Sequence, residues 1–81
     1  GAFYEALNSA ALTGTHVVFV VTIPALPDDA PVARQIAGTP VEIAQALGIT
    51  TLTPDATAEA ISEAVKTARN GEGPTLVQIT L

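Results

Sequence analysis

The sequence predicts an α/β fold, in which residues 1–81 form one small domain built on a parallel sheet with helical crossovers, in two or three layers. Three short stretches read as strands because they are rich in apolar and β-branched residues and are bounded by glycine or proline: residues 17–21, 49–53 and 75–81. The segments before and between them carry apolar residues at helical spacing. Because parallel strands are joined by crossovers, this alternation favours a single parallel sheet.

The composition excludes several classes of function. The net charge is −5, and the only basic residues are Arg34, Lys66 and Arg69, too few for the basic surface that nucleic acid requires. The chain has no cysteine, which excludes disulfides and a thiol nucleophile. No apolar run reaches the roughly 18 residues that span a bilayer. Residues 1–12 lack the pattern of a signal peptide, so we expect a cytoplasmic protein with neither a membrane nor a nucleic-acid partner.

Residues 1–13 are expected to form the first helix. Phe3, Leu7 and Ala10 recur at helical spacing, and Gly14 is placed to end the helix with a positive φ. No capping residue precedes the helix, so we expect the chain to begin inside a structural unit. The helix is also apolar on a second side, which predicts that it lies between two surfaces. The residues of this second side are Tyr4, Ala11 and Leu12.

The apolar run at residues 17–21 predicts a central strand covered by helices on both faces. It ends at Thr22-Ile23-Pro24, and an irregular loop of about fifteen residues follows, because proline cannot continue the ladder. Such a loop in so small a domain suggests a function or the remains of one. The residues that mark this loop are Pro24, Pro27, Asp28, Asp29 and Pro31.

The second helix is expected at residues 40–47. It has a Thr39 cap, Pro40 at the first helical position and Glu42 completing a capping box, and Gly48 ends it. Residues 49–53 are the short strand that follows. The chain then has a proline and two candidate caps for the next helix, Asp55 and Thr57, and the sequence does not choose between them.

The third predicted helix has the clearest apolar face, and a turn leads from it to the last strand. The expected apolar face consists of Ala58, Ile61, Val65 and Ala68. The expected wet face consists of Glu59, Ser62, Glu63 and Lys66. Residues 70–74 form the turn, and the face expected for the last strand consists of Val77, Ile79 and Leu81. Because this turn joins a helix to a strand, Gly71 and Gly73 are turn glycines and not a nucleotide-binding loop.

No catalytic set can be assembled from these residues, and we assign no catalytic, cofactor-binding or metal-binding residue. His16 is the only imidazole and is interpreted as a loop residue at a helix–strand junction. Asp28 and Asp29 could form half of a metal site, but a divalent cation needs oxygen ligands from several segments. The favoured interpretation of this pair is a solvated loop charge pair.

Five blocks of the chain nevertheless resemble one family. Residues 1–8, G-A-F-Y-E-A-L-N, with V-V-F-V at 17–20, resemble the G-x-x-x-E-A-L-N helix and V-x-F-V strand of E1 alpha subunits of pyruvate and branched-chain 2-oxoacid dehydrogenases. P-V-A-R-Q at 31–35 resembles the P-x-x-R-Q of the next loop. I-A-Q-A-L-G-I at 43–49 resembles a following helix with a short deletion. Residues 61–65, with G-E-G-P-T-L-V at 71–77, resemble the closing E-A-V helix and G-P-T-L-I strand.

The resemblance implies part of the thiamine-diphosphate-binding fold. In that family Mg²⁺ holds the cofactor's diphosphate, with ligands from a G-D-G turn ahead of the first helix and an N-N pair just after the V-x-F-V strand. This chain begins after the expected G-D-G, and where N-N is expected it has Ile23-Pro24, with no side-chain oxygen. Thr22 is a poor substitute. No cofactor residue can therefore be carried over, and we expect neither thiamine diphosphate nor Mg²⁺ on this chain alone.

The leading hypothesis is a fragment or degenerate relative of the C-terminal part of the cofactor-binding domain of such an E1 alpha subunit. The complete family catalyses thiamine-diphosphate-dependent oxidative decarboxylation of a 2-oxoacid, an oxidoreductase reaction, but this chain is expected to be inactive alone. Its residues do not decide whether it is an enzyme. The alternative hypotheses are a non-catalytic α/β subunit-interaction module and an unrelated flavodoxin-like domain. The expected partners are a second copy or a covering subunit, with the E1 beta subunit implied by the resemblance.

Overall fold

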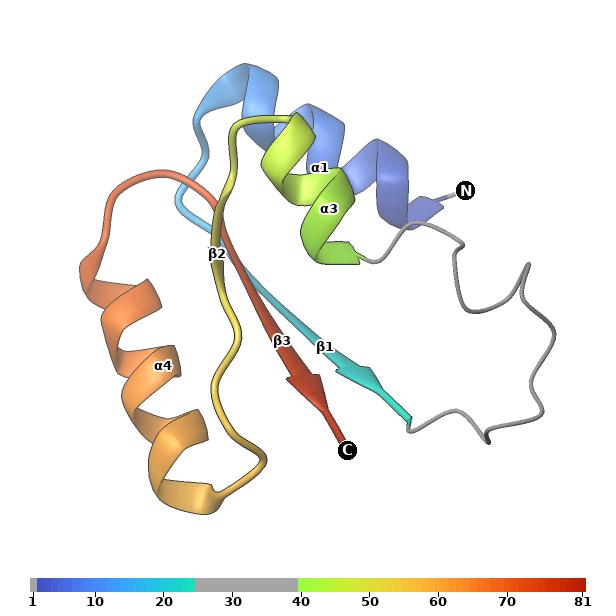
Figure 1. Cartoon of the computed structure of the whole chain (residues 1–81). Coiled ribbons are helices and arrows are strands. Elements are labelled where there is room, and N and C mark those ends of the chain that lie inside the picture. The colour runs from blue at the N-terminus through green and yellow to red at the C-terminus, as the bar shows by residue number, and fades with distance from the viewer. Residues whose placement is uncertain (1, 25–39) are drawn as a thin grey trace, which may run out of the picture.

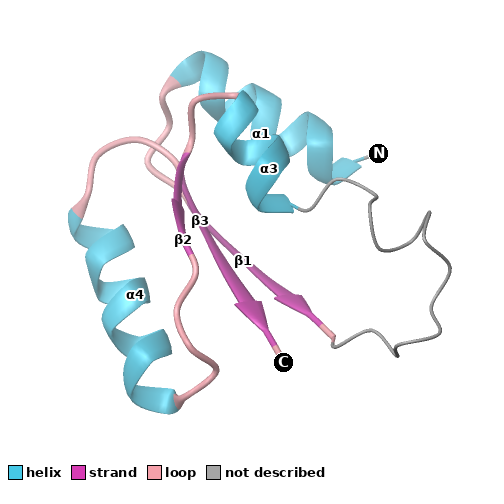
Figure 2. Ribbon diagram, in the orientation of Figure 1, coloured by secondary structure: helices cyan, strands magenta, loops and turns pink. Residues whose placement is uncertain are grey.

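A computed structural model describes residues 2–24 and 40–81. This part of the chain has three helices and three strands. They alternate along the chain, as can be followed in Figures 1 and 2. In chain order they are α1 (Ala2–Thr13), β1 (Val18–Ile23), α3 (Pro40–Ala46), β2 (Thr50–Leu52), α4 (Ala58–Asn70) and β3 (Thr75–Thr80). The predicted loop, with Asp28, Asp29 and the P-V-A-R-Q block, lies outside the described residues. The predicted cap Thr39 also lies outside them.

The three strands form one parallel sheet in the order β1-β3-β2. Val18 and Thr50 both align with Thr75, so all three strands start level with one another and run in the same direction. The predicted α/β class and the parallel sheet are thereby confirmed.

One prediction about the sheet is wrong. The strand expected to be central, at residues 17–21, is β1, and it lies at an edge of the described sheet, while β3 is central. Leu76 and Val77 of β3 are fully buried, whereas Val20 of β1 is 52% exposed. An uninterrupted apolar run shows that helices cover a strand, but it does not show how many strands pair with it. Strand order is set by pairing between distant segments, which periodicity does not report.

Helices cover both faces of the sheet, which gives three layers (Figure 1). On one face, α1 and α3 bury Leu7 and Ala44 against Leu76 of β3. On the other face, α4 buries Ala64 and Ala68. The residues of β3 in this second cluster are Val77 and Ile79. Alternation along β3 therefore places the consecutive side chains of Leu76 and Val77 in two separate cores.

The helix ends follow local signals in the sequence. α1 ends at Thr13, and Gly14 has φ +67° with its N–H bonded to the carbonyl of Ala10 at 2.9 Å, as the sequence predicted. Gly48, after α3, has φ +78°. Thr57 is the cap of α4, because its hydroxyl accepts the N–H of Ala60 at 3.2 Å. This bond decides between the two candidate caps.

Two details of the predicted apolar faces are wrong. Ala58 is exposed and Ala64 is buried in its place, because the side of α4 that contacts the sheet centres on Ala64 and Ala68. Leu81 is 64% exposed, and β3 ends one residue before it, at Thr80. The predicted wet face of α4 is confirmed, because all four of its members are exposed.

Candidate functional site

The carboxyl ends of the three strands lie at one edge of the sheet, formed by Ile23, Leu52 and Thr80. In open α/β sheets this is the edge at which ligands bind, since the loops that leave it converge there. It is also the edge at which the family resemblance implies a cofactor. The chemistry of this edge therefore decides what the described residues could hold.

Ile23 and Pro24 occupy the end of β1, where the resemblance implies two asparagines. The carbonyl of Ile23 already accepts the N–H of Leu81 at 2.9 Å, and Pro24 has no N–H to donate. Both side chains are hydrocarbon. Thr22 is exposed and contributes one hydroxyl. A hydroxyl is a weaker ligand for Mg²⁺ than the carboxylate and amide oxygens that this ion prefers, so the end of β1 is a poor place to hold a metal diphosphate.

The end of β2 contributes the carboxylate of Asp55, which is exposed. The backbone carbonyl of Asp55 accepts the N–H of Thr57 at 2.8 Å, and Thr57 in turn occupies the N–H of Ala60. The amino end of α4 is thus partly satisfied within the chain. Within residues 2–24 and 40–81, no three His, Cys, Asp or Glu side chains lie close enough to hold a metal ion.

His16 lies at the opposite edge of the sheet, just before β1. It is exposed, and its Nε2 is 3.4 Å from the carbonyl oxygen of Ala68 near the end of α4. The interpretation as a junction residue is confirmed. The contact across 52 positions was not foreseen, because no local pattern reports it. This contact joins the segment before β1 to the last turn of α4.

The turn glycines are also confirmed in their structural role. Gly71 follows α4 in an extended conformation, with its N–H bonded to the carbonyl of Ala68 at 3.3 Å. Gly73 has φ +72° and leads into β3. Both lie between a helix and a strand, where no helix amino end is available to receive a phosphate.

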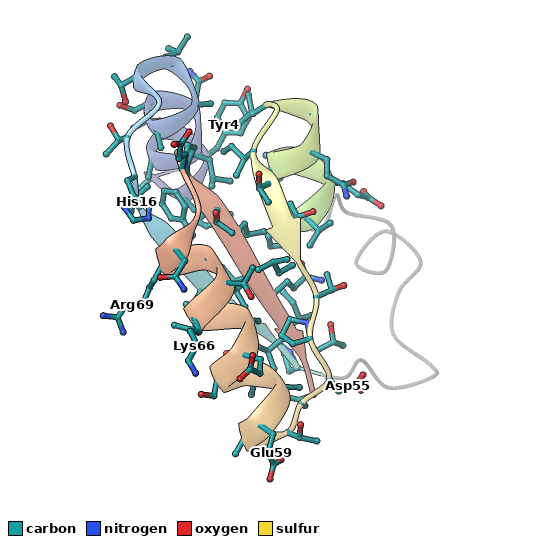
Figure 3. All side chains as sticks on the ribbon, turned by 90° about the vertical axis from the view of Figure 1, so that its left-hand side faces the viewer. Tyr4, His16, Asp55, Glu59, Lys66 and Arg69 are labelled. Carbon is teal, nitrogen blue, oxygen red and sulfur yellow. The ribbon has the colours of Figure 1, made fainter. Side chains whose placement is uncertain are left out.

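The structure brings together a second group of residues that the sequence analysis did not connect. Lys66 and Arg69 point to the side of the molecule on which His16 lies, away from β2 (Figure 3). An open hollow runs along this side of α4. The residues that line it are Ser62, Val65, Lys66, Arg69 and Asn70. These cations are two of the three in the chain. The strand on the side of the described sheet away from β2 is β1, which pairs with β3 alone among the described strands.

No protein-family model matches this chain, and no curated protein shows a significant match to it. Among the described helices, none is both long and apolar enough to cross a membrane.

Proposed function

We propose that this chain is a fragment or degenerate relative of the E1 alpha subunit of a thiamine-diphosphate-dependent 2-oxoacid dehydrogenase, and that it is catalytically inactive by itself. The observation that carries the proposal is the placement of the resembling blocks in successive elements of one parallel sheet. E-A-L-N lies in α1, V-F-V in β1, I-A-Q-A in α3 and T-L-V in β3. Each of these four blocks lies on a different helix or strand, in the order along the chain that the resemblance gives them.

The inactivity follows from the chemistry of the carboxyl edge. A diphosphate carries several negative charges and is held through a metal ion by oxygen ligands. Ile23 and Pro24 offer only hydrocarbon side chains at the position that the resemblance assigns to two amide ligands. The remaining oxygens on the described edge belong to threonine hydroxyls and to the exposed Asp55. This donor set supports the absence of cofactor binding that we propose.

Calorimetric titration of the chain with thiamine diphosphate and Mg²⁺ tests the inactivity. We expect no heat of binding beyond dilution, with or without the metal. Tight, metal-dependent binding would mean that the edge holds the diphosphate without the asparagine pair, and the proposed inactivity would be wrong.

A chimera tests the family relationship itself. The matching segment of an intact E1 alpha subunit is replaced by this chain, and the product is mixed with its E1 beta subunit. We expect the chimera to assemble but to bind no thiamine diphosphate. The double change Ile23→Asn and Pro24→Asn in the same chimera is expected to restore metal-dependent binding, because it returns two amide oxygens to the end of β1. A chimera that fails to fold or assemble would count against the relationship.

A second candidate function is a non-catalytic module for subunit contact. The observation that favours it is the apolar surface of α1, where Tyr4 is 48% and Leu12 is 79% exposed. The side that faces the sheet is already covered, since Leu7 is fully buried. Assembly of the chimera without recovery of cofactor binding in the double asparagine variant would favour this candidate over the first.

A further inference from the structure

The backbone of β1 presents a regular set of hydrogen-bonding groups on the side away from β3. The carbonyls of Val17 and Ile23 accept bonds from β3. Successive residues of a strand direct their backbone groups to alternate sides, so the odd-numbered residues of β1 face β3. The even-numbered residues, Val18, Val20 and Thr22, therefore direct their N–H and C=O groups outward. Six groups at the spacing of a strand form a template for another strand.

The same three residues carry their side chains on the face of the sheet that α4 covers. Val18, Val20 and Thr22 align with Thr75, Val77 and Ile79 of β3, two of which pack against α4. Helix α4 does not fully cover β1, because Val20 is 52% exposed while its partner in β3, Val77, is fully buried. An arriving strand would bury Val20 as well as complete the ladder.

Two cations, Lys66 and Arg69, lie on the side of α4 away from β2, although the chain as a whole is acidic (Figure 3). Arg69 makes no ion pair within the described part of the chain, and Lys66 makes one exposed contact of 3.8 Å with Glu63. Such an exposed pair is weak and leaves the lysine able to contact another carboxylate. No carboxylate lies in any of the three strands. The side of β1 that no described strand pairs with, here called the open edge, therefore combines outward backbone groups with the two cations of α4.

We propose that the open edge of β1 binds an extended, acidic segment of a partner protein by strand addition. The segment pairs with the outward groups of Val18, Val20 and Thr22, covers Val20 with an apolar side chain, and places carboxylates beside Arg69 and Lys66. Backbone bonds supply affinity in this mode of recognition and side chains supply selectivity. This site lies along the strand, not at the carboxyl edge, so it does not depend on the proposed cofactor chemistry.

Charge argues against a second copy of the chain as the occupant. The β1 strand of another copy would bring only uncharged side chains, Val-Phe-Val-Val-Thr-Ile, to the edge. Its carboxylates lie on helices and loops in the described residues. A second copy could therefore pair with the outward backbone groups of β1 but would bring no carboxylate from that strand to Arg69 and Lys66. An acidic segment could provide both the backbone pairing and the carboxylates.

The test uses the full chain and two fluorescent peptides of alternating valine and threonine, one ending in two glutamates and the other in two lysines. Fluorescence anisotropy measures their binding at low and high salt. We expect the acidic peptide to bind about tenfold more tightly than the basic one, with a preference that shrinks as salt screens the charges.

Two variants separate the contribution of the backbone hydrogen bonds to peptide binding from the contribution of charge. Val20→Pro removes an outward N–H without touching the ladder to β3, a change that edge strands tolerate, and should weaken both peptides about five- to tenfold. Arg69→Gln should weaken only the acidic peptide. Thr67→Glu is the matched control, because it changes the net charge by the same amount from a position about 200° around α4. Thermal melts establish that each variant is folded.

Several results would overturn the proposal. Equal binding of the two peptides would remove the acidic preference. Unchanged binding in both Val20→Pro and Arg69→Gln would place any bound peptide elsewhere. Sedimentation showing a dimer that Val20→Pro dissolves would make a second copy the occupant. Peptide preference lost in Arg69→Gln but kept in Thr67→Glu would support the site as we describe it.

Discussion

The side-chain oxygen Oε1 of Gln78 lies 3.3 Å from the backbone nitrogen of Val41 and accepts its hydrogen bond. Gln78 is in the central strand, and Val41 is in the first turn of α3, where backbone N–H groups have no partner within the helix. The bond therefore fixes the amino end of a seven-residue helix to the middle of the sheet. It also gives the polar side chain of Gln78 a partner among the buried residues of the strand.

Replacing Gln78 by leucine keeps most of the side-chain volume and removes the acceptor. We expect a loss of about 1 kcal/mol in the free energy of unfolding, because the N–H of Val41 loses its partner. In a chain of this size that corresponds to a fall of roughly 4–8 °C in Tm. Gln45→Leu is the control, since Gln45 makes an exposed bond of 3.2 Å to Thr51. Equal Tm values for the two variants would show that the Gln78 bond contributes no more stability than the exposed Gln45 bond.

Local signals account for the parts of the fold that the sequence predicted well. Gly14 and Thr57 act through their own backbone and near neighbours, so the ends of α1 and α4 could be located from a few residues. The contacts that were missed join distant segments. Gln78 contacts Val41 across 37 positions, and His16 contacts Ala68 across 52. Periodicity carries no information about such pairs, and the order of the strands was misjudged for the same reason.

In the candidate site, too, features set by which residues are present could be predicted from the sequence, and features set by their arrangement in space could not. The absence of an amide pair at Ile23 and Pro24 could be read from the sequence, since it concerns which residues are present. The placement of Lys66 and Arg69 on the side of α4 away from β2 could not, because it depends on how the helix is turned on the sheet (Figure 3). A helical pattern gives the exposed face of a helix but not its neighbour in space.

Gly14 and Gly71 provide a paired test of backbone conformation. Gly14 has φ +67°, a region that costs a residue with a β-carbon about 1 kcal/mol, so Gly14→Ala should destabilise the chain by about that amount. Gly71 has φ −81°, and a β-carbon there would meet carbonyl oxygens at 3.6 Å, an ordinary contact. Gly71→Ala should therefore be neutral or stabilise by up to about 1 kcal/mol. Urea unfolding of both variants checks the difference, and the opposite order would contradict the turn assignments.

Leu7 and Leu12 allow the same substitution to be compared at the two sides of α1. Leu7 is fully buried against Ala44, Ile49 and Leu76, so Leu7→Ala should cost about 2–5 kcal/mol through lost burial and the cavity left behind. A chain of this length has a total stability of only about 4–12 kcal/mol, so this variant should unfold at a much lower urea concentration.

Leu12 is 79% exposed, and Leu12→Ala should change the stability of the monomer by less than about 0.5 kcal/mol. Both changes exchange the same residues within one helix, so helix propensity cancels and the difference reports burial alone. The comparison is made by urea unfolding at low and high protein concentration. If Leu12→Ala is neutral when dilute but destabilising when concentrated, Leu12 is covered by another chain in solution. A large cost at every concentration would instead mean that Leu12 packs within the monomer, and the exposed apolar side of α1 would not exist.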